Sequence, residues 1–70
     1  MPNLRAIETF IRAQQGGSIA SAARQMGITP AAASQNIARL EQEIGTRLLI
    51  RSTRSLALTD AGMLYLERVA

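Results

Sequence analysis

The segment Gly27-Ile28-Thr29-Pro30 joins two short helical patterns and constrains the fold more than any other part of the chain. Gly27 can adopt the positive φ that ends a helix, and the Thr29 hydroxyl can cap the next one. Pro30 then stands at the first helical position, where its missing N–H costs nothing. The segment predicts a helix over residues 18–26, a tight turn with Ile28 facing the core, and a helix over residues 30–44.

The residues before the turn predict one more helix and a shared core. This first helix covers residues 3–15 and is ended by Gly16-Gly17, after which Ser18 caps the helix over 18–26. Gly45 ends the helix over 30–44 in the same way. Apolar residues at helical spacing predict the buried faces of the three helices: Leu4, Ile7, Phe10, Ile11, Ile19, Ala22, Ala23, Met26, Ala33, Ile37, Leu40 and Ile44.

Two short runs with strand-like alternation follow the third helix. Leu48 and Ile50 alternate with Leu49 and Arg51. Leu56 and Leu58 alternate around Ala57, and the polar segment 52–55 joins the two runs as a turn. These runs predict a β-hairpin, or wing, which must pack on the helices because a lone hairpin is marginal in water.

A fourth helix is predicted from about residue 60. Thr59 caps it, and Asp60 places negative charge at the positive end of its dipole. Its apolar residues form one row that Leu64 widens: Met63, Leu66 and Val69. The predicted fold is therefore mainly α with a small β-hairpin, a winged helix-turn-helix in the order helix, helix, helix, strand, strand, helix.

The composition excludes several classes of site. The chain has 70 residues, enough for one small domain. It has no cysteine and no histidine, which excludes disulfides, the usual zinc sites, thiol nucleophiles and imidazole catalysis. Tyr65 among several arginines is a faint sign of a tyrosine recombinase, but without histidine to assist it we expect no enzyme, no metal and no cofactor. Because the sequence contains neither a long apolar run nor a signal peptide, we expect a cytoplasmic protein without a membrane partner.

The positive charge is arranged in a way that favours a polyanionic partner. The net charge is +3, and every basic residue is an arginine. GC-rich codon usage would also explain the absence of lysine, but the placement is more informative. Arg47, Arg51 and Arg54 lie in a stretch, residues 44–59, that contains no acid. Arg39 and Arg47 can each be interpreted in two ways. Both can contact a DNA backbone, or Arg39 can pair with Glu43 and Arg47 with Glu41.

The start of the third helix is the predicted DNA-contacting surface. In a helix-turn-helix, residues near the beginning of the second helix contact base edges in the major groove. Here these residues are short and uncharged, and no charged residue occurs between Gly27 and Ala38. The candidate contacts are Thr29, Pro30, Ala31, Ser34 and Gln35. The alternative is a winged helix whose uncharged face is buried against a partner protein.

The side chains of this surface suit particular contacts. Gln35 can bond adenine N6 and N7 in a bidentate manner, although a phosphate contact or plain solvent exposure would also suit it. Asn36 can face either the DNA or a neighbouring helix. The helices that begin at Ser18 and Thr29 can each hold a phosphate at their N-terminus. In the wing, residues 51–55, Arg51 and Arg54 can contact the DNA backbone or the minor groove. For Arg54 the alternative is a solvated charge in a loop.

The chain resembles the N-terminal DNA-binding domain of the LysR-type bacterial transcriptional regulators. The matching stretches are SIASAARQMGITPAAAS and IARLEQEIGTRLLIRSTRSLALTDAG. The resemblance implies that residues 1–58 form the DNA-binding domain and that residues 59–70 begin a linker helix through which two subunits pair. It also implies tetramers of the full-length protein on double-stranded DNA with dyad symmetry. A small-molecule effector would bind a larger C-terminal domain, so the sequence is expected to be an excised domain or a fragment.

Three residues depart from the family's pattern. Gln35 stands where many members have arginine, which favours an adenine contact over a guanine contact. Ala33 replaces a commoner valine, and Leu49 replaces a commoner phenylalanine. Because both are smaller, we expect a less tightly packed core.

Overall fold

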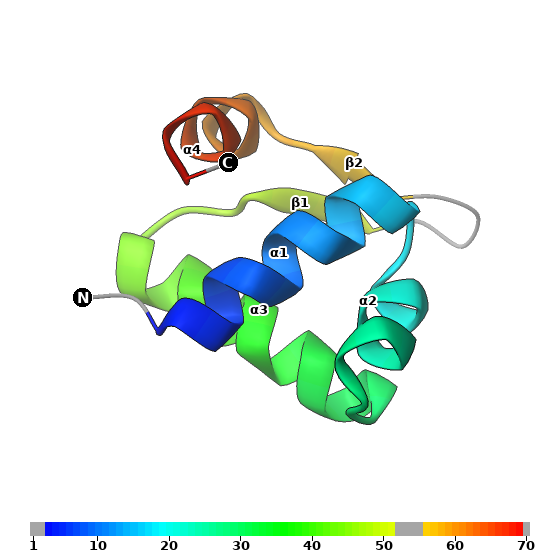
Figure 1. The fold of residues 1–70 in the computed structure, drawn as a ribbon. Helices are drawn as coiled ribbons and strands as arrows, with labels where there is room; N and C mark the ends of the chain where they lie inside the picture. Colours follow the sequence, from blue (N-terminus) through cyan, green and yellow to red (C-terminus); the bar gives the residue numbers. More distant parts are fainter. Residues whose placement is uncertain (1–2, 52–55, 70) are drawn as a thin grey trace.

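The computed structural model describes residues 3–51 and 56–69 and confirms the predicted winged helix-turn-helix. Three helices come first, followed by an antiparallel hairpin and a fourth helix (Figure 1). Their bounds are α1 Leu4–Gly16, α2 Ile19–Met26, α3 Pro30–Ile44, β1 Leu49–Arg51, β2 Leu56–Leu58 and α4 Asp60–Val69. Within the described ranges, no helix combines the length and the apolar character that a membrane crossing needs.

The helix boundaries follow from the capping residues that the sequence predicts. Ser18 Oγ accepts a hydrogen bond from Ser21 N at 3.0 Å, and Thr29 Oγ1 accepts one from Ala32 N at 3.0 Å. Gly27 has a φ of 69°, and its left-handed conformation turns the chain from α2 into α3. The tight turn is therefore set by local chemistry at both of its ends.

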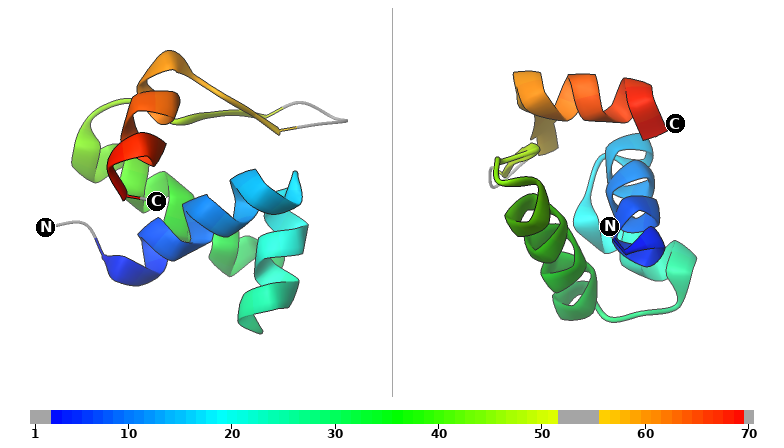
Figure 2. Two further views of the ribbon diagram at one scale, coloured as in Figure 1. Left: turned by 45° about the horizontal axis from the view of Figure 1, so that its top comes forward. Right: turned by 90° about the vertical axis from the view of Figure 1, so that its left-hand side faces the viewer.

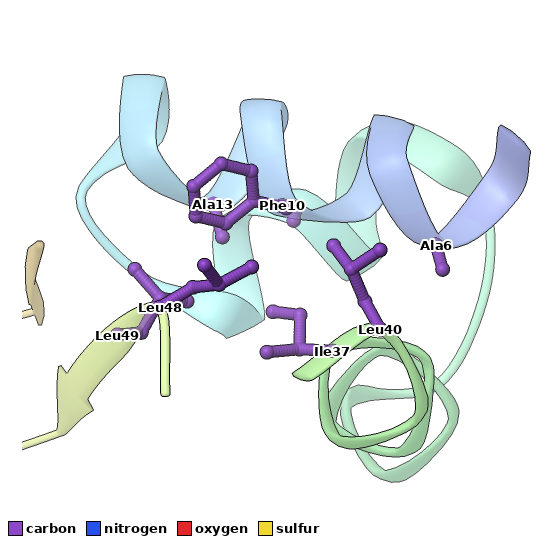
Figure 3. Packing of buried hydrophobic residues seen from close by; sticks show 8 residues of the cluster. Ala6, Phe10, Ala13, Ile37, Leu40, Leu48 and Leu49 are labelled. Atoms are coloured by element: carbon purple, nitrogen blue, oxygen red, sulfur yellow. The ribbon is translucent and has the colours of Figure 1, made fainter. Parts of the chain in front are cut away.

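The core lies between α1, α3 and the start of the hairpin (Figure 3). Phe10 on α1 and Ile37 and Leu40 on α3 are fully buried. Ala22 and Ala23 bring α2 close to the other helices because their side chains are small. The prediction that Leu4 belongs to the buried face of α1 is wrong, because Leu4 is 79% exposed. The buried residue of the first turn is Ala6.

The hairpin is a two-stranded antiparallel sheet in which Leu49 pairs with Leu58, Ile50 with Ala57, and Arg51 with Leu56. Leu56 and Leu58 pack against the core, as predicted. In the first strand Leu49 is buried whereas Ile50 is 55% exposed, so Leu49 faces the core. Leu48 is also buried, but it lies before β1, so strand alternation does not relate it to Ile50.

The beginning of α4 is tied closely to the base of the hairpin. Thr59 N donates to Leu48 O at 3.0 Å, and Thr59 Oγ1 donates to Arg47 O at 2.6 Å. The same hydroxyl oxygen accepts from Gly62 N at 2.9 Å and caps the helix, as predicted. Gly62 is buried against the backbone of Leu48, where the structure has no room for a Cβ atom.

The predicted apolar row of α4 is only partly buried. Ala61, Tyr65 and Leu66 pack against the core, whereas Met63 is 56% exposed and Leu64 is 61% exposed. The Tyr65 ring lies 5.8 Å from the Phe10 ring, centroid to centroid, at an interplanar angle of 58°. Such a tilted aromatic pair is a favourable arrangement and joins α4 to α1.

Tyr65 should make the stability of the fold sensitive to alkaline pH. Burial raises the pKa of the Tyr65 phenol above its ordinary value of 10.0, and the negative charge of Glu43 raises it further. The folded state thus favours the neutral phenol of Tyr65 over the ionised one. The contribution of Tyr65 to the free energy of unfolding is therefore complete below the pKa of the phenol in the unfolded chain, about 10, and is lost as pH rises through its pKa in the folded chain. Since the sequence lacks lysine, cysteine and histidine, no other side chain titrates between about pH 8 and 12.

We therefore expect the free energy of unfolding to be flat up to about pH 9.5 and to fall above it. Urea unfolding across this range, followed by circular dichroism, measures the effect. Tyr65→Phe should abolish the fall, and an equal fall in that variant would contradict the assignment.

Candidate nucleic-acid interface

The N-terminal half of α3 presents an uncharged surface to solvent. Thr29, Pro30, Ala31 and Gln35 are exposed, and Ser34 is half-buried. Pro30 and Ala31 belong to the first turn of α3, and Gln35 lies just over one turn further along. Small side chains at the helix start would let the backbone approach a groove, and Gln35 extends furthest from it.

The hairpin lies on the same side of the molecule as α3. In the right-hand view of Figure 2, α3 and the hairpin are on one side and α1 is on the other. Arg51 is the last residue of β1, where it pairs with Leu56. Arg54, the other predicted wing contact, lies outside the described residues. Helix α3 and the strand that carries Arg51 therefore lie on one side of the molecule.

Ser18 and Thr29 occupy the predicted positions at the starts of α2 and α3. Both hydroxyl oxygens accept hydrogen bonds from backbone amides of their own helices. Capping is therefore their structural role. The remaining amides of the first turns point outward from the helix ends, as they do at helix termini that bind anions. Phosphate binding at these two ends remains a prediction.

Asn36, for which two orientations were open, contacts a neighbouring helix. Its Nδ2 donates to Thr9 Oγ1 on α1 at 3.2 Å. The Thr9 side chain is fully buried between the helices. The sequence does not reveal this role of Thr9, because a threonine within a helix gives no local sign of a partner 27 residues away.

Glu41 is a second residue whose role the sequence did not reveal. Its Oε2 accepts hydrogen bonds from Leu48 N at 2.8 Å and Leu49 N at 3.1 Å. These bonds fix the point where the chain enters the hairpin. Arg47 Nε lies 3.8 Å from the same oxygen, so the predicted Arg47–Glu41 pair exists but is long, and its arginine is exposed.

The other predicted ion pair does not form. Among the described residues Arg39 makes no ion pair with Glu43, and its side chain is exposed. Arg39 is thus available for a contact with a DNA backbone. The described residues also contain no group of three or more acidic side chains that could hold a metal ion. The surface is suited to binding a polyanion through uncharged groups flanked by arginines.

Known proteins that resemble this chain in sequence and in structure are bacterial helix-turn-helix transcriptional regulators. Residues 4–63 match the family described as bacterial regulatory helix-turn-helix protein, lysR family. An uncharacterized HTH-type transcriptional regulator of Mycobacterium bovis is 43% identical over 70 residues, which is all of this chain and 22% of that protein. This chain therefore spans about a fifth of the length of that relative.

Solved structures of the family share the fold. A transcriptional regulator of the LysR family from Eggerthella lenta superposes with a TM-score of 0.85 at 35% identity, covering 94% of each chain. A crystal structure of the CbnR DNA-binding domain in complex with DNA gives a TM-score of 0.91 at 31% identity. That match covers 96% of this chain and 77% of the CbnR chain.

Proposed function

This chain belongs to the lysR family of bacterial regulatory helix-turn-helix proteins and is the DNA-binding domain of a transcriptional regulator, and from that premise we propose which of its residues contact DNA. The start of α3 enters the major groove, where Gln35 and Ser34 contact base edges. Pro30 and Ala31 allow close approach. Arg51 and Arg54 contact the backbone or the minor groove, and the N-termini at Ser18 and Thr29 hold phosphates.

One observation carries this proposal. Helix α3, whose start is exposed and uncharged, and the hairpin that carries Arg51 lie on one side of the molecule (Figure 2). An uncharged face alone would also suit a protein partner, but the acid-free arginine stretch beside it favours a polyanion.

The salt dependence of binding tests this assignment. Cations that neutralise phosphates release bound counterions, so affinity for duplex DNA should fall steeply and linearly on a logarithmic salt scale. A DNA duplex selected by this chain from random sequences provides the ligand, and fluorescence anisotropy provides the dissociation constant. Affinity that is independent of salt, or failure to enrich any sequence, would favour the protein-binding alternative.

Gln35→Ala tests the predicted base contact. Loss of a bidentate amide contact should cost roughly 1–3 kcal/mol at a single base pair and leave the other positions unchanged. A series of duplexes with one substituted base pair each measures this loss. Gln42→Ala is the matched control, because Gln42 is an exposed glutamine near the other end of α3. Equal base preferences in the Gln35→Ala variant and the unmodified chain would show that Gln35 contacts no base.

The organisation of the whole protein follows the same premise. We propose that residues 1–58 form the DNA-binding unit and that residues 59–70 begin a linker helix. The exposed Met63 and Leu64 side chains on α4 support pairing of two copies through that helix. The pairing would give a dimer on DNA with dyad symmetry and would contribute to a tetramer of the full-length protein. A small-molecule effector would bind a C-terminal domain of that protein, which would be located in the cytoplasm.

A further inference from the structure

A buried polar contact joins α1 to the helix that carries the proposed base contacts. Thr9 on α1 is fully buried. Its Oγ1 donates to Arg5 O, one turn earlier, at 2.7 Å, and lies 3.4 Å from Met26 Sδ. The same oxygen accepts from Asn36 Nδ2 at 3.2 Å. No buried side-chain nitrogen or oxygen in the described ranges lacks a hydrogen-bond partner, so this contact is satisfied on both sides.

The direction of this contact is fixed by α1 itself. Because the Thr9 hydroxyl donates its hydrogen to the carbonyl of its own helix, its acceptor lone pairs remain for a donor on α3. Asn36 supplies that donor. A hydrogen bond weakens steeply when its distance or angle changes, whereas apolar contacts depend little on direction. The Thr9–Asn36 bond can therefore fix the rotation of α3 about its axis more sharply than the surrounding apolar core.

Rotation of α3 matters because Asn36 directly follows Gln35. A side-chain atom about 6 Å from a helix axis moves by about 1 Å when the helix turns by 10°. A shift of 1 Å is enough to break a bidentate contact with a base edge. Contacts between arginines and phosphates tolerate such a shift better, since they depend mainly on charge.

We propose that Thr9 is a positioning residue for sequence discrimination. Through Asn36 it sets the rotation of α3 that lets Gln35 and Ser34 meet their bases. This inference rests on the proposed function, because it assumes that α3 contacts base edges. It assigns to Thr9 no contact with DNA and no general role in affinity.

The test compares variants by their discrimination ratio. This ratio is the dissociation constant for a scrambled duplex divided by that for the duplex selected by the unmodified chain, both at one salt concentration. Thr9→Val keeps the shape of the side chain but removes the hydroxyl, and it should lower the ratio about five- to tenfold while leaving affinity for the scrambled duplex unchanged. Thr9→Ser keeps the hydroxyl and should retain the ratio.

Two further variants separate positioning from stability. Ile37→Val removes a methylene from the same α1–α3 contact without touching the hydrogen bond, and it should retain the ratio even if it lowers the melting temperature. Asn36→Ala breaks the bond from the half-buried side and serves if Thr9→Val fails to fold. It should lower the ratio as Thr9→Val does, and the double variant should be no worse than either single variant.

Each outcome decides the proposal. An unchanged ratio in Thr9→Val would overturn it and leave DNA binding by the chain intact. An equal loss in Thr9→Val, Thr9→Ser and Ile37→Val would overturn it in favour of general destabilisation. A ratio near one for the unmodified chain would overturn both this inference and the proposed function.

Discussion

Gly62→Ala should destabilise the fold by about 3 kcal/mol and lower the melting temperature by roughly 10–20 °C. In an unobstructed helix the same change stabilises, since alanine has the better helix propensity by about 1 kcal/mol. Here the new Cβ would collide with the carbonyl oxygen of Leu48, which cannot rotate away as a side chain could. Relief requires moving either α4 or the base of the hairpin.

Thermal unfolding followed by circular dichroism checks this expectation. Glu67→Ala is the control, because Glu67 is exposed on the same helix and the substitution creates the same residue. The control should change stability by less than about 0.5 kcal/mol. A Gly62→Ala variant as stable as the unmodified chain would show that α4 can shift away from Leu48 at little cost.

Glu41→Ala should be nearly as damaging, with an expected loss of about 2–4 kcal/mol. The carboxylate accepts from the backbone amides of Leu48 and Leu49, whose side chains are 0% and 1% exposed. Removing it leaves two backbone donors without their acceptor in a buried setting. Glu41→Gln keeps one carbonyl oxygen as an acceptor but loses the charge, so a smaller loss is expected.

Urea unfolding measures the loss for Glu41→Ala, and amide hydrogen exchange locates it. Exchange at Leu48 and Leu49 should accelerate more than exchange in α1. Glu43→Ala is the matched control, since Glu43 is an exposed acid two residues further along α3. If the two amides exchange equally fast in both variants, Glu41 does not fix the entry to the hairpin.

The helices and their ends could be predicted because the relevant signals are local. Ser18, Thr29 and Thr59 each bond an amide three residues ahead, as their positions before apolar runs indicated. The glycine at the tight turn has the expected positive φ. Local chemistry of this kind does not depend on how the rest of the chain packs.

The errors concern which apolar residues find a partner. Periodicity gives the direction of a side chain but not whether a neighbouring element extends far enough to cover it. Leu4, in the first turn of α1, has the spacing of a core residue but is exposed. Met63 and Leu64 on α4 are exposed in the same way. In β1 the alternation did not show which row faces the core, and the structure buries Leu49 and exposes Ile50.

The uncharged surface of α3 could be predicted from the sequence, but the contacts that support it could not. Its uncharged character followed from the absence of charge between Gly27 and Ala38, and the structure shows that its start is exposed. The partner of Asn36 is a threonine 27 residues earlier, and the partners of Glu41 are backbone amides. Every residue except proline has such an amide, so no pattern of residue types distinguishes the two that Glu41 binds.

The Phe10–Tyr65 contact bears on how such domains can be exchanged between regulators. Because Ala61, Tyr65 and Leu66 complete the core, α4 belongs to the packing of the residues that precede it as well as to whatever follows it. A chimaera joined at residue 58 would place a foreign side chain against Phe10. A junction after Leu66 would transfer both rings of the native pair, and chimaeras built that way should keep the thermal stability of the donor domain.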